Sequence, residues 1–221
     1  MKTVRAYEAS YTVGEEIANA VTHGVATLLS IAGLVLLIVF SVRYADSALL
    51  VSSVTVFGVS LILLYLTSTL YHAIPFPKIK KVFQVLDHSM IYVLIAGSYT
   101  PFCLVTLGGT TGLILCAAEW AIALAGIAFQ KVLLKRSDWL NCALYLAMGW
   151  LVLLVIKPLV AGLPAGGLAL LACGGMAYSV GVIFYVWERL PFSHAIWHVF
   201  VLAGSVLQYL AVLLYVIPVL H

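Results

Sequence analysis

Long apolar runs separated by short polar connections repeat along the whole sequence. Each run is close to the roughly 20 residues that a helix needs to cross about 30 Å of hydrocarbon. Apolar and polar residues do not alternate strictly within the runs, as they would in the strands of a membrane barrel. The pattern predicts an all-α polytopic membrane protein with seven transmembrane helices, at residues 20–46, 48–74, 84–107, 111–134, 139–160, 164–187 and 192–218.

Composition agrees with this interpretation. Hydrophobic residues make up 64% of the 221 positions, charged residues only 9%, and the mean hydropathy is +1.16. The connections are too short for a soluble domain, and Glu8, Glu15 and Glu16 precede an apolar run much longer than that of a signal peptide. We therefore expect residues 1–221 to form a single seven-helix membrane domain.

Lysine and arginine are divided unequally between the two sides of the predicted bundle. The side of the N-terminus carries nine of them, namely Lys2, Arg5, Lys78, Lys80, Lys81, Lys131, Lys135, Arg136 and Arg189. The other side carries only Arg43 and Lys157. Because cationic connections are retained in the cytoplasm, we predict a cytoplasmic N-terminus, a C-terminus outside, and a location in the inner (cytoplasmic) membrane. The net charge of +3 then faces anionic lipid, and no basic motif indicates nucleic-acid binding.

Four side chains that can bind a metal are predicted to lie at one depth, near the cytoplasmic ends of their helices. These are His72, Asp87, His194 and His198. His72 comes just before the helix-stopping residue Pro75. Asp87 lies about 9 Å along its helix from Lys81. His194 and His198 follow Arg189 by five and nine residues. Residues distant in sequence are therefore expected to converge in space.

A spacing of four residues determines which of these side chains face the same way. Ser68 and His72 share one helical face, as do His194 and His198, so three imidazoles from two helices can meet. Three histidines suit zinc and leave one coordination position open, where the pKa of a bound water falls to about 7. Asp87 would orient this water or act as general base, and Ser68 would donate a hydrogen bond beside it.

Other polar residues near the same side have more than one interpretation. Glu16, Asn19 and His23 share one stripe of the first helix. They fit hydrogen bonding to the metal ligands or a lid over the site, while helix capping explains Glu16 equally well. His88 projects about 100° away from Asp87 and is expected to pack at the interface rather than to bind metal.

Glu119 is different, because it lies deep in the fourth predicted helix, where an ionised carboxylate is costly. We expect it to be protonated and hydrogen-bonded, with a proton or substrate path past Gln208 as the functional alternative. Elsewhere, pairs of small residues four apart, such as Ala177 and Gly181, favour close packing of helices rather than ligand binding.

Four segments together resemble a known family. They are E-E-I-A-N-x-V-T-H (Glu15 to His23), S-T-L-Y-H-A-I-P (Ser68 to Pro75), D-H-S-x-I-Y-x-L-I-A-G-S-Y-T-P-F (Asp87 to Phe102) and H-A-I-W-H (His194 to His198). Over essentially the whole chain the sequence resembles the bacterial hemolysin III branch of the progestin and adipoQ receptor superfamily. The resemblance implies a seven-helix fold with a cytoplasmic N-terminus. It also implies Zn²⁺ held by His72, His194 and His198, with Asp87 and Ser68 beside the water.

The resemblance suggests functions from different classes. The superfamily also resembles alkaline ceramidases, which implies a zinc-dependent amidohydrolase that acts on a lipid or other amphipathic amide. The names hemolysin and receptor imply lysis, pore formation or signalling, with zinc as a structural clamp between the second and seventh helices. Ion conduction is a third class, but Glu119, Gln208 and scattered hydroxyls make a sparse polar path. We take hydrolysis as the leading hypothesis and the receptor-like or lytic protein as its alternative.

Overall fold

The computed structural model describes residues 11–45, 47–136, 138–187 and 189–217. Within these ranges every regular element is helical, and seven segments are long and apolar enough to cross a membrane. The predicted all-α, seven-helix membrane fold is confirmed. Lys2, Arg5 and His221, which belong to the predicted topology, lie outside the described residues.

Four of the crossings are single α-helices, and three are composite. The single helices are α1 (Val13–Ala45), α2 (Ala48–Ala73), α4 (Gly109–Arg136) and α7 (Ala165–Val186). Two α-helices end in a π-helix: α3 (Pro77–Pro101) continues as η1 (Phe102–Leu107), and α8 (Ser193–Ala211) continues as η3 (Val212–Val216). The fifth crossing consists of α5 (Asp138–Gly149), the 3-10 helix η2 (Leu151–Val155) and α6 (Ile156–Gly162).

Two helices begin earlier than hydropathy predicts, because their first turns are polar. Thr12 and Glu15 form a capping box at the start of α1: the Thr12 N–H donates to the Glu15 carboxylate over 2.9 Å, and the Glu15 N–H donates to Thr12 Oγ1 over 3.3 Å. Helix α3 starts at Pro77, a residue favoured in the first turn because its missing N–H needs no partner there. These added turns carry charged residues to the end of the bundle that holds the histidines.

The fifth crossing departs from the single helix expected at 139–160. Its α-helical hydrogen bonding stops at Gly149, and a 3-10 segment precedes Pro158. Pro158 lacks the N–H that would bond to the carbonyl of Leu154, so a continuous α-helix is not favoured there. The Tyr99 hydroxyl of α3 replaces the lost bonds, because it donates to the carbonyls of Met148 and Gly149 at 3.0 and 2.8 Å.

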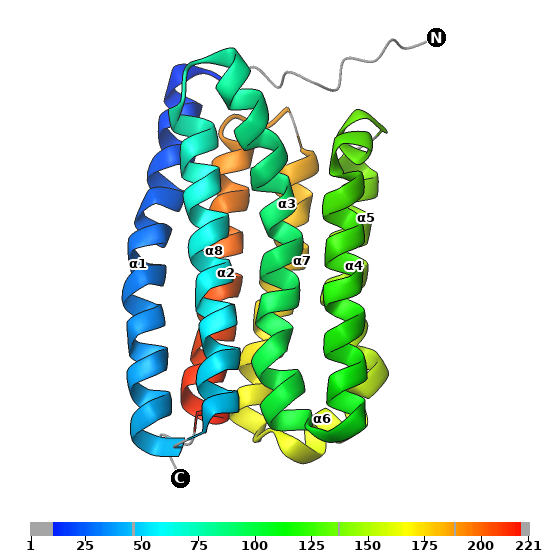
Figure 1. Cartoon of the computed structure of the whole chain (residues 1–221). Helices are drawn as coiled ribbons and strands as arrows, with labels where there is room; N and C mark the ends of the chain where they lie inside the picture. Colours follow the sequence, from blue (N-terminus) through cyan, green and yellow to red (C-terminus); the bar gives the residue numbers. More distant parts are fainter. Residues whose placement is uncertain (1–10, 46, 137, 188, 218–221) are drawn as a thin grey trace.

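The contacts between the crossings close into a ring, and the helices run side by side (Figure 1). Each of α1, α2, α3 and α4 packs against the next helix in sequence, α5 packs against α7, α7 against α8, and α8 returns to α1. The start of α1, the connection from α2 to α3 and the connection from α7 to α8 lie at the upper end in Figure 1, whereas α6 lies at the lower end. Three segments that carry the predicted site residues therefore meet at the upper end.

Candidate metal centre

Helices α2 and α8 bring three histidines together at this end of the bundle. His72 lies in the last turn of α2, and His194 and His198 lie one turn apart near the start of α8. One ring nitrogen from each of the three lies within 4.8 Å of the other two. The ring centroid of His72 is 5.1 Å from that of His194 and 5.2 Å from that of His198. The described residues thus include a buried three-histidine group that could bind a metal ion.

Two ring nitrogens of this group lack a partner in the described part of the chain, which is the chemical reason to expect an ion. His72, His194 and His198 are 3%, 9% and 1% exposed, and Nε2 of both His72 and His194 has no hydrogen-bond partner among the described residues. Leaving such a nitrogen buried and unpaired costs about 1–3 kcal/mol. Zn–N distances of about 2.0–2.1 Å would place the nitrogens about 3.4 Å apart, which small side-chain rotations can reach. The donor set therefore fits a tetrahedral ion.

Contacts from α1 orient two of the three rings for binding. His72 Nδ1 is 2.7 Å from Glu16 Oε2, and His198 Nδ1 is 3.3 Å from the carbonyl oxygen of Asn19. Both of these oxygens can only accept, so each Nδ1 must carry the proton. The lone pair of each ring is consequently on Nε2, which is the tautomer that a metal ligand needs.

The two neighbouring glutamates of α1 have different contacts. Glu16 lies between His72 and Lys80, whose ammonium group is 2.8 Å from Glu16 Oε1 and also donates to the Tyr71 carbonyl. Glu15 instead caps its own helix and accepts from the N–H of Phe192 over 3.0 Å, just before α8. The sequence was equally consistent with Glu16 capping its helix and with Glu16 contacting one of the candidate metal ligands. The structure shows the contact with His72.

Two further aromatic rings surround the histidines. His23, a third residue of the same stripe, stacks on His198 with ring centroids 3.5 Å apart. The ring of Tyr11 lies 5.7 Å from that of His72 and 5.1 Å from that of His194. Sequence reasoning did not single out Tyr11, because it lies before the first apolar run and belongs to no spacing pattern. It covers part of the group from the chain preceding α1.

Asp87 and Ser68, the two residues expected beside the water, line one cavity together with His194 and His198. Both are buried, and the Ser68 hydroxyl lies near the Asp87 carboxyl without a hydrogen bond of good geometry. We expected His88 to pack at the interface, and in the structure its side chain is buried. It donates through Nδ1 to the Gln84 carbonyl at 2.9 Å and accepts from the Tyr185 hydroxyl at 3.3 Å, and it does not belong to the three-histidine group.

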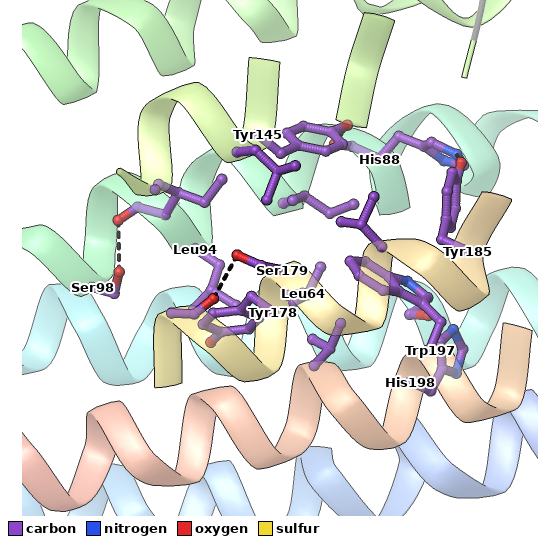
Figure 2. A pocket seen from close by; sticks show the side chains of 18 of the residues that line it. Leu64, His88, Leu94, Ser98, Tyr145, Tyr178, Ser179, Tyr185, Trp197 and His198 are labelled. Atoms are coloured by element: carbon purple, nitrogen blue, oxygen red, sulfur yellow. Dashed lines mark hydrogen bonds between the residues drawn. The ribbon is translucent and has the colours of Figure 1, made fainter. Parts of the chain in front are cut away.

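The cavity extends from the histidines into the middle of the bundle. Figure 2 shows it reaching from His88, Tyr185 and His198 at one end to Ser98 at the other. Between these ends the lining is mainly apolar and includes Leu64 and Leu94. A polar group at the histidines can therefore be continued by an alkyl chain within the same cavity.

Glu119 lies apart from this arrangement. It is fully buried in α4, which packs against α3 and α5, and it is not among the residues lining the cavity. Its two carboxyl oxygens have no hydrogen-bond partner among the described residues. The hydrogen-bonded carboxyl expected from the sequence is therefore not found in the described contacts. Gln208, the polar neighbour considered for it, lines the cavity instead.

Comparison with known proteins tests the family resemblance independently of the structure. A family model described as haemolysin-III related matches residues 11–209. The hemolysin-3 homolog of Bacillus subtilis (strain 168) is 52% identical over 209 residues, which are 95% of this chain and 98% of that protein. Hemolysin-3 of Bacillus cereus is 50% identical over 206 residues, covering 93% and 94% of the two chains. The human monocyte to macrophage differentiation factor is 29% identical over 207 residues, covering 91% and 84%.

These matches include every segment on which the resemblance was based, from the glutamate pair of α1 to the histidine pair of α8. The family expected from the sequence is thereby confirmed. The seven apolar crossings agree with it. The chain belongs to the haemolysin-III related family of multi-pass membrane proteins.

Proposed function

We propose that this protein is a zinc-dependent hydrolase of the cell membrane that acts on a lipid or other amphipathic amide. The observation that carries the proposal is a group of three buried imidazoles, two of which, His194 and His198, line an apolar cavity that Asp87 and Ser68 also line. Zinc is the expected ion because three neutral nitrogens suit its borderline-soft character and its tetrahedral preference. When bound, it supplies a nucleophilic water at neutral pH and polarises a carbonyl group.

The surrounding side chains have complementary roles in this proposal. The Asp87 carboxyl accepts a proton from the attacking water and holds that water in position. The Ser68 hydroxyl, next to Asp87, donates a hydrogen bond to the oxygen on which negative charge develops. Glu16 keeps the His72 proton on Nδ1, so that Nε2 remains available.

The cavity supports an amphipathic substrate over a small polar one. Its apolar walls, which include Ile91, Leu94 and Val201, would bury an alkyl chain, and each buried methylene contributes about 0.8 kcal/mol. The amide would then lie beside the histidines, where the lining becomes polar. Membrane lipids are the expected source of such molecules.

A structural role for zinc is the competing proposal, and one observation favours it. The three histidines come from α2 and α8, so an ion bound to them would clamp two helices that are distant in sequence. A receptor-like or lytic membrane protein would need only this clamp. Under that proposal Asp87 has no role in turnover.

Two substitutions separate the proposals. We expect His72→Ala to lose zinc, measured by metal analysis of the purified protein. We expect Asp87→Asn to retain zinc while release of fatty acid from long-chain N-acyl amides in proteoliposomes falls at least about 100-fold, the usual contribution of a general base. His88→Gln is the matched control, because His88 is buried beside Asp87 yet outside the three-histidine group, and it should retain zinc.

The opposite pattern would reject the hydrolase. If Asp87→Asn leaves turnover unchanged while His72→Ala only lowers thermal stability, zinc is a structural clamp. If no N-acyl amide in a total lipid extract is consumed by the zinc-loaded wild type, the amide assignment fails even when zinc is bound.

A further inference from the structure

A second cavity continues where the first one ends. Its lining includes Leu107 of η1, Leu159 of α6 and Leu168 of α7, all toward the end of the bundle opposite the histidines. The two cavities share six lining residues, Ser98, Tyr99, Gly149, Trp150, Gly175 and Gln208, which we call the waist. The interior therefore has two apolar compartments in series, with the waist between them.

One polar atom of the waist has no hydrogen-bond partner in the part of the chain that the structure describes. Gln208 Oε1 is buried without a partner among the described residues. Ser98 Oγ donates to the Ile95 carbonyl and keeps lone pairs to accept with. The Tyr99 hydroxyl and the Trp150 indole N–H are already bonded, to the α5 break and to Ser179. The waist thus offers an unpaired acceptor beside the N–H groups of the same Gln208 amide, a combination that a hydroxyl group matches because it can both donate and accept.

The depth of the waist can be measured along two helices. Gln208 follows His198 by ten residues of α8, and Ser98 follows Asp87 by eleven residues of α3. At 1.5 Å per residue the waist lies about 15–16 Å from the metal centre. Both helices place it at the same distance, which corresponds to the middle of a long alkyl chain rather than to its head.

We propose that the waist binds a hydroxyl group carried partway along a long single-chain lipid. The head of this lipid lies at the histidines, its hydroxyl donates to Gln208 Oε1, and its remaining carbons occupy the second cavity. The position of the head rests on the proposed function, whereas the waist contact does not depend on turnover. Without such a donor, Gln208 would keep an unpaired buried oxygen between two apolar compartments.

A positional series of fatty acids tests the proposal directly. In an extended chain with carbon–carbon bonds of about 1.5 Å, carbon 12 lies about 14 Å from the carboxyl carbon. The probes are octadecanoic acid and its 12-hydroxy and 16-hydroxy derivatives, measured by displacement of radiolabelled octadecanoic acid from the full chain loaded with zinc. We expect the 12-hydroxy acid to bind about 3- to 10-fold more tightly than the 16-hydroxy acid, whose oxygen would lie in the apolar second cavity.

Variants then assign the preference to one side chain. Gln208→Leu should bring the two hydroxy acids to equal affinity while octadecanoic acid still binds. Gln208→Met serves if the leucine variant does not fold. Gln130→Leu is the control, because Gln130 is a buried amide that does not line either cavity, and it should keep the preference.

Two results would overturn the proposal, and neither depends on catalysis. Equal affinities of the 12-hydroxy and 16-hydroxy acids in the wild type would show that no group at the waist recognises a donor. An unchanged preference in Gln208→Leu would show that another group does so. A separate arm compares octadecanoic acid binding in the wild type and His72→Ala: unchanged affinity there contradicts the placement of the head at the metal, and therefore the proposed function, without deciding the waist.

Discussion

At the scale of single residues, the proton on His72 depends on Glu16. The carboxylate accepts from Nδ1 over 2.7 Å and is itself held by Lys80. A charged acceptor in this position fixes the ring's orientation and increases the basicity of Nε2, the nitrogen that would face a metal ion. The second residue of the E-E pair is therefore expected to contribute to metal affinity without contacting the ion.

We predict that Glu16→Gln lowers zinc affinity about 10- to 100-fold, the usual effect of changing such a supporting partner. The amide still accepts a hydrogen bond but carries no charge. Competition with a zinc chelator gives the affinity. Glu15→Gln is the control, since Glu15 contacts Thr12 and Phe192 but none of the three histidines, and its affinity should match the wild type. Equal losses in both variants would contradict a specific role for Glu16.

The sequence allowed the three histidines to be predicted because spacing within a helix is a local property. His194 and His198 must share a face, and the position of His72 before Pro75 places it at a helix end. The contacts of α1 were not accessible in the same way. The contact between Glu16 and a histidine nitrogen depends on how α1 packs against α2 and α8. That packing cannot be read from the spacing of residues in a single sequence.

At the scale of elements, the close approach of α7 and α8 positions the histidine-bearing helix. A methyl group on Gly181 would lie 2.8 Å from the Cβ of Phe200 and 2.9 Å from the ring of Trp197, between the two histidines of α8. A Cβ contact under 3.0 Å with an atom fixed to the backbone requires one helix to shift. The small-residue spacing of Ala177 and Gly181 indicated close packing, and the structure identifies its partner.

Gly181→Ala is accordingly expected to destabilise the protein by about 1–3 kcal/mol through overpacking. Gly175→Ala on the same helix should be neutral or stabilising, because its added methyl would meet Trp150 at an ordinary 3.5 Å and alanine favours helix. Unfolding in mixed detergent micelles measures both. If the two variants change stability in the same direction and to the same extent, the close approach of α7 and α8 is not limiting.

Hydropathy predicted the number of helices well but not their interruptions. The run containing Gly149 and Pro158 is mostly apolar, so a windowed pattern treats it as one helix. Whether a proline bends, breaks or merely loosens a helix depends on which neighbour accepts the freed backbone bonds. Here Tyr99 from α3 does so, and that contact lies beyond any local pattern.

At the scale of the whole molecule, the metal centre and most of the predicted cationic connections share one end of the bundle. Helix α1 starts there, and the described Lys78, Lys80 and Lys81 lie in the first turns of α3 at the same end. If the positive side is the cytoplasmic one, the histidines lie just beneath the inner leaflet. The side of the membrane itself remains a prediction from charge.

Reporter fusions test this topology. With a cytoplasmic N-terminus and seven crossings, alkaline phosphatase fused after His221 should be active and green fluorescent protein at the same position dark. A fusion truncated after Arg189 should show the reverse, because that connection is predicted to be cytoplasmic. The inverse pattern in both fusions would place the metal centre at the outer leaflet and would contradict the charge-based assignment.

The interrupted fifth crossing also has a consequence for how the protein excludes ions and water from the membrane. In most transmembrane helices each turn closes its own hydrogen bonds, so loss of one side chain does not admit ions or water. Here the Tyr99 phenol also accepts from the N–H of Val152, at 2.9 Å, as well as donating to two carbonyls. One oxygen atom thus serves three backbone groups, and we predict that exclusion of ions and water at that level depends on an aromatic side chain of the neighbouring helix.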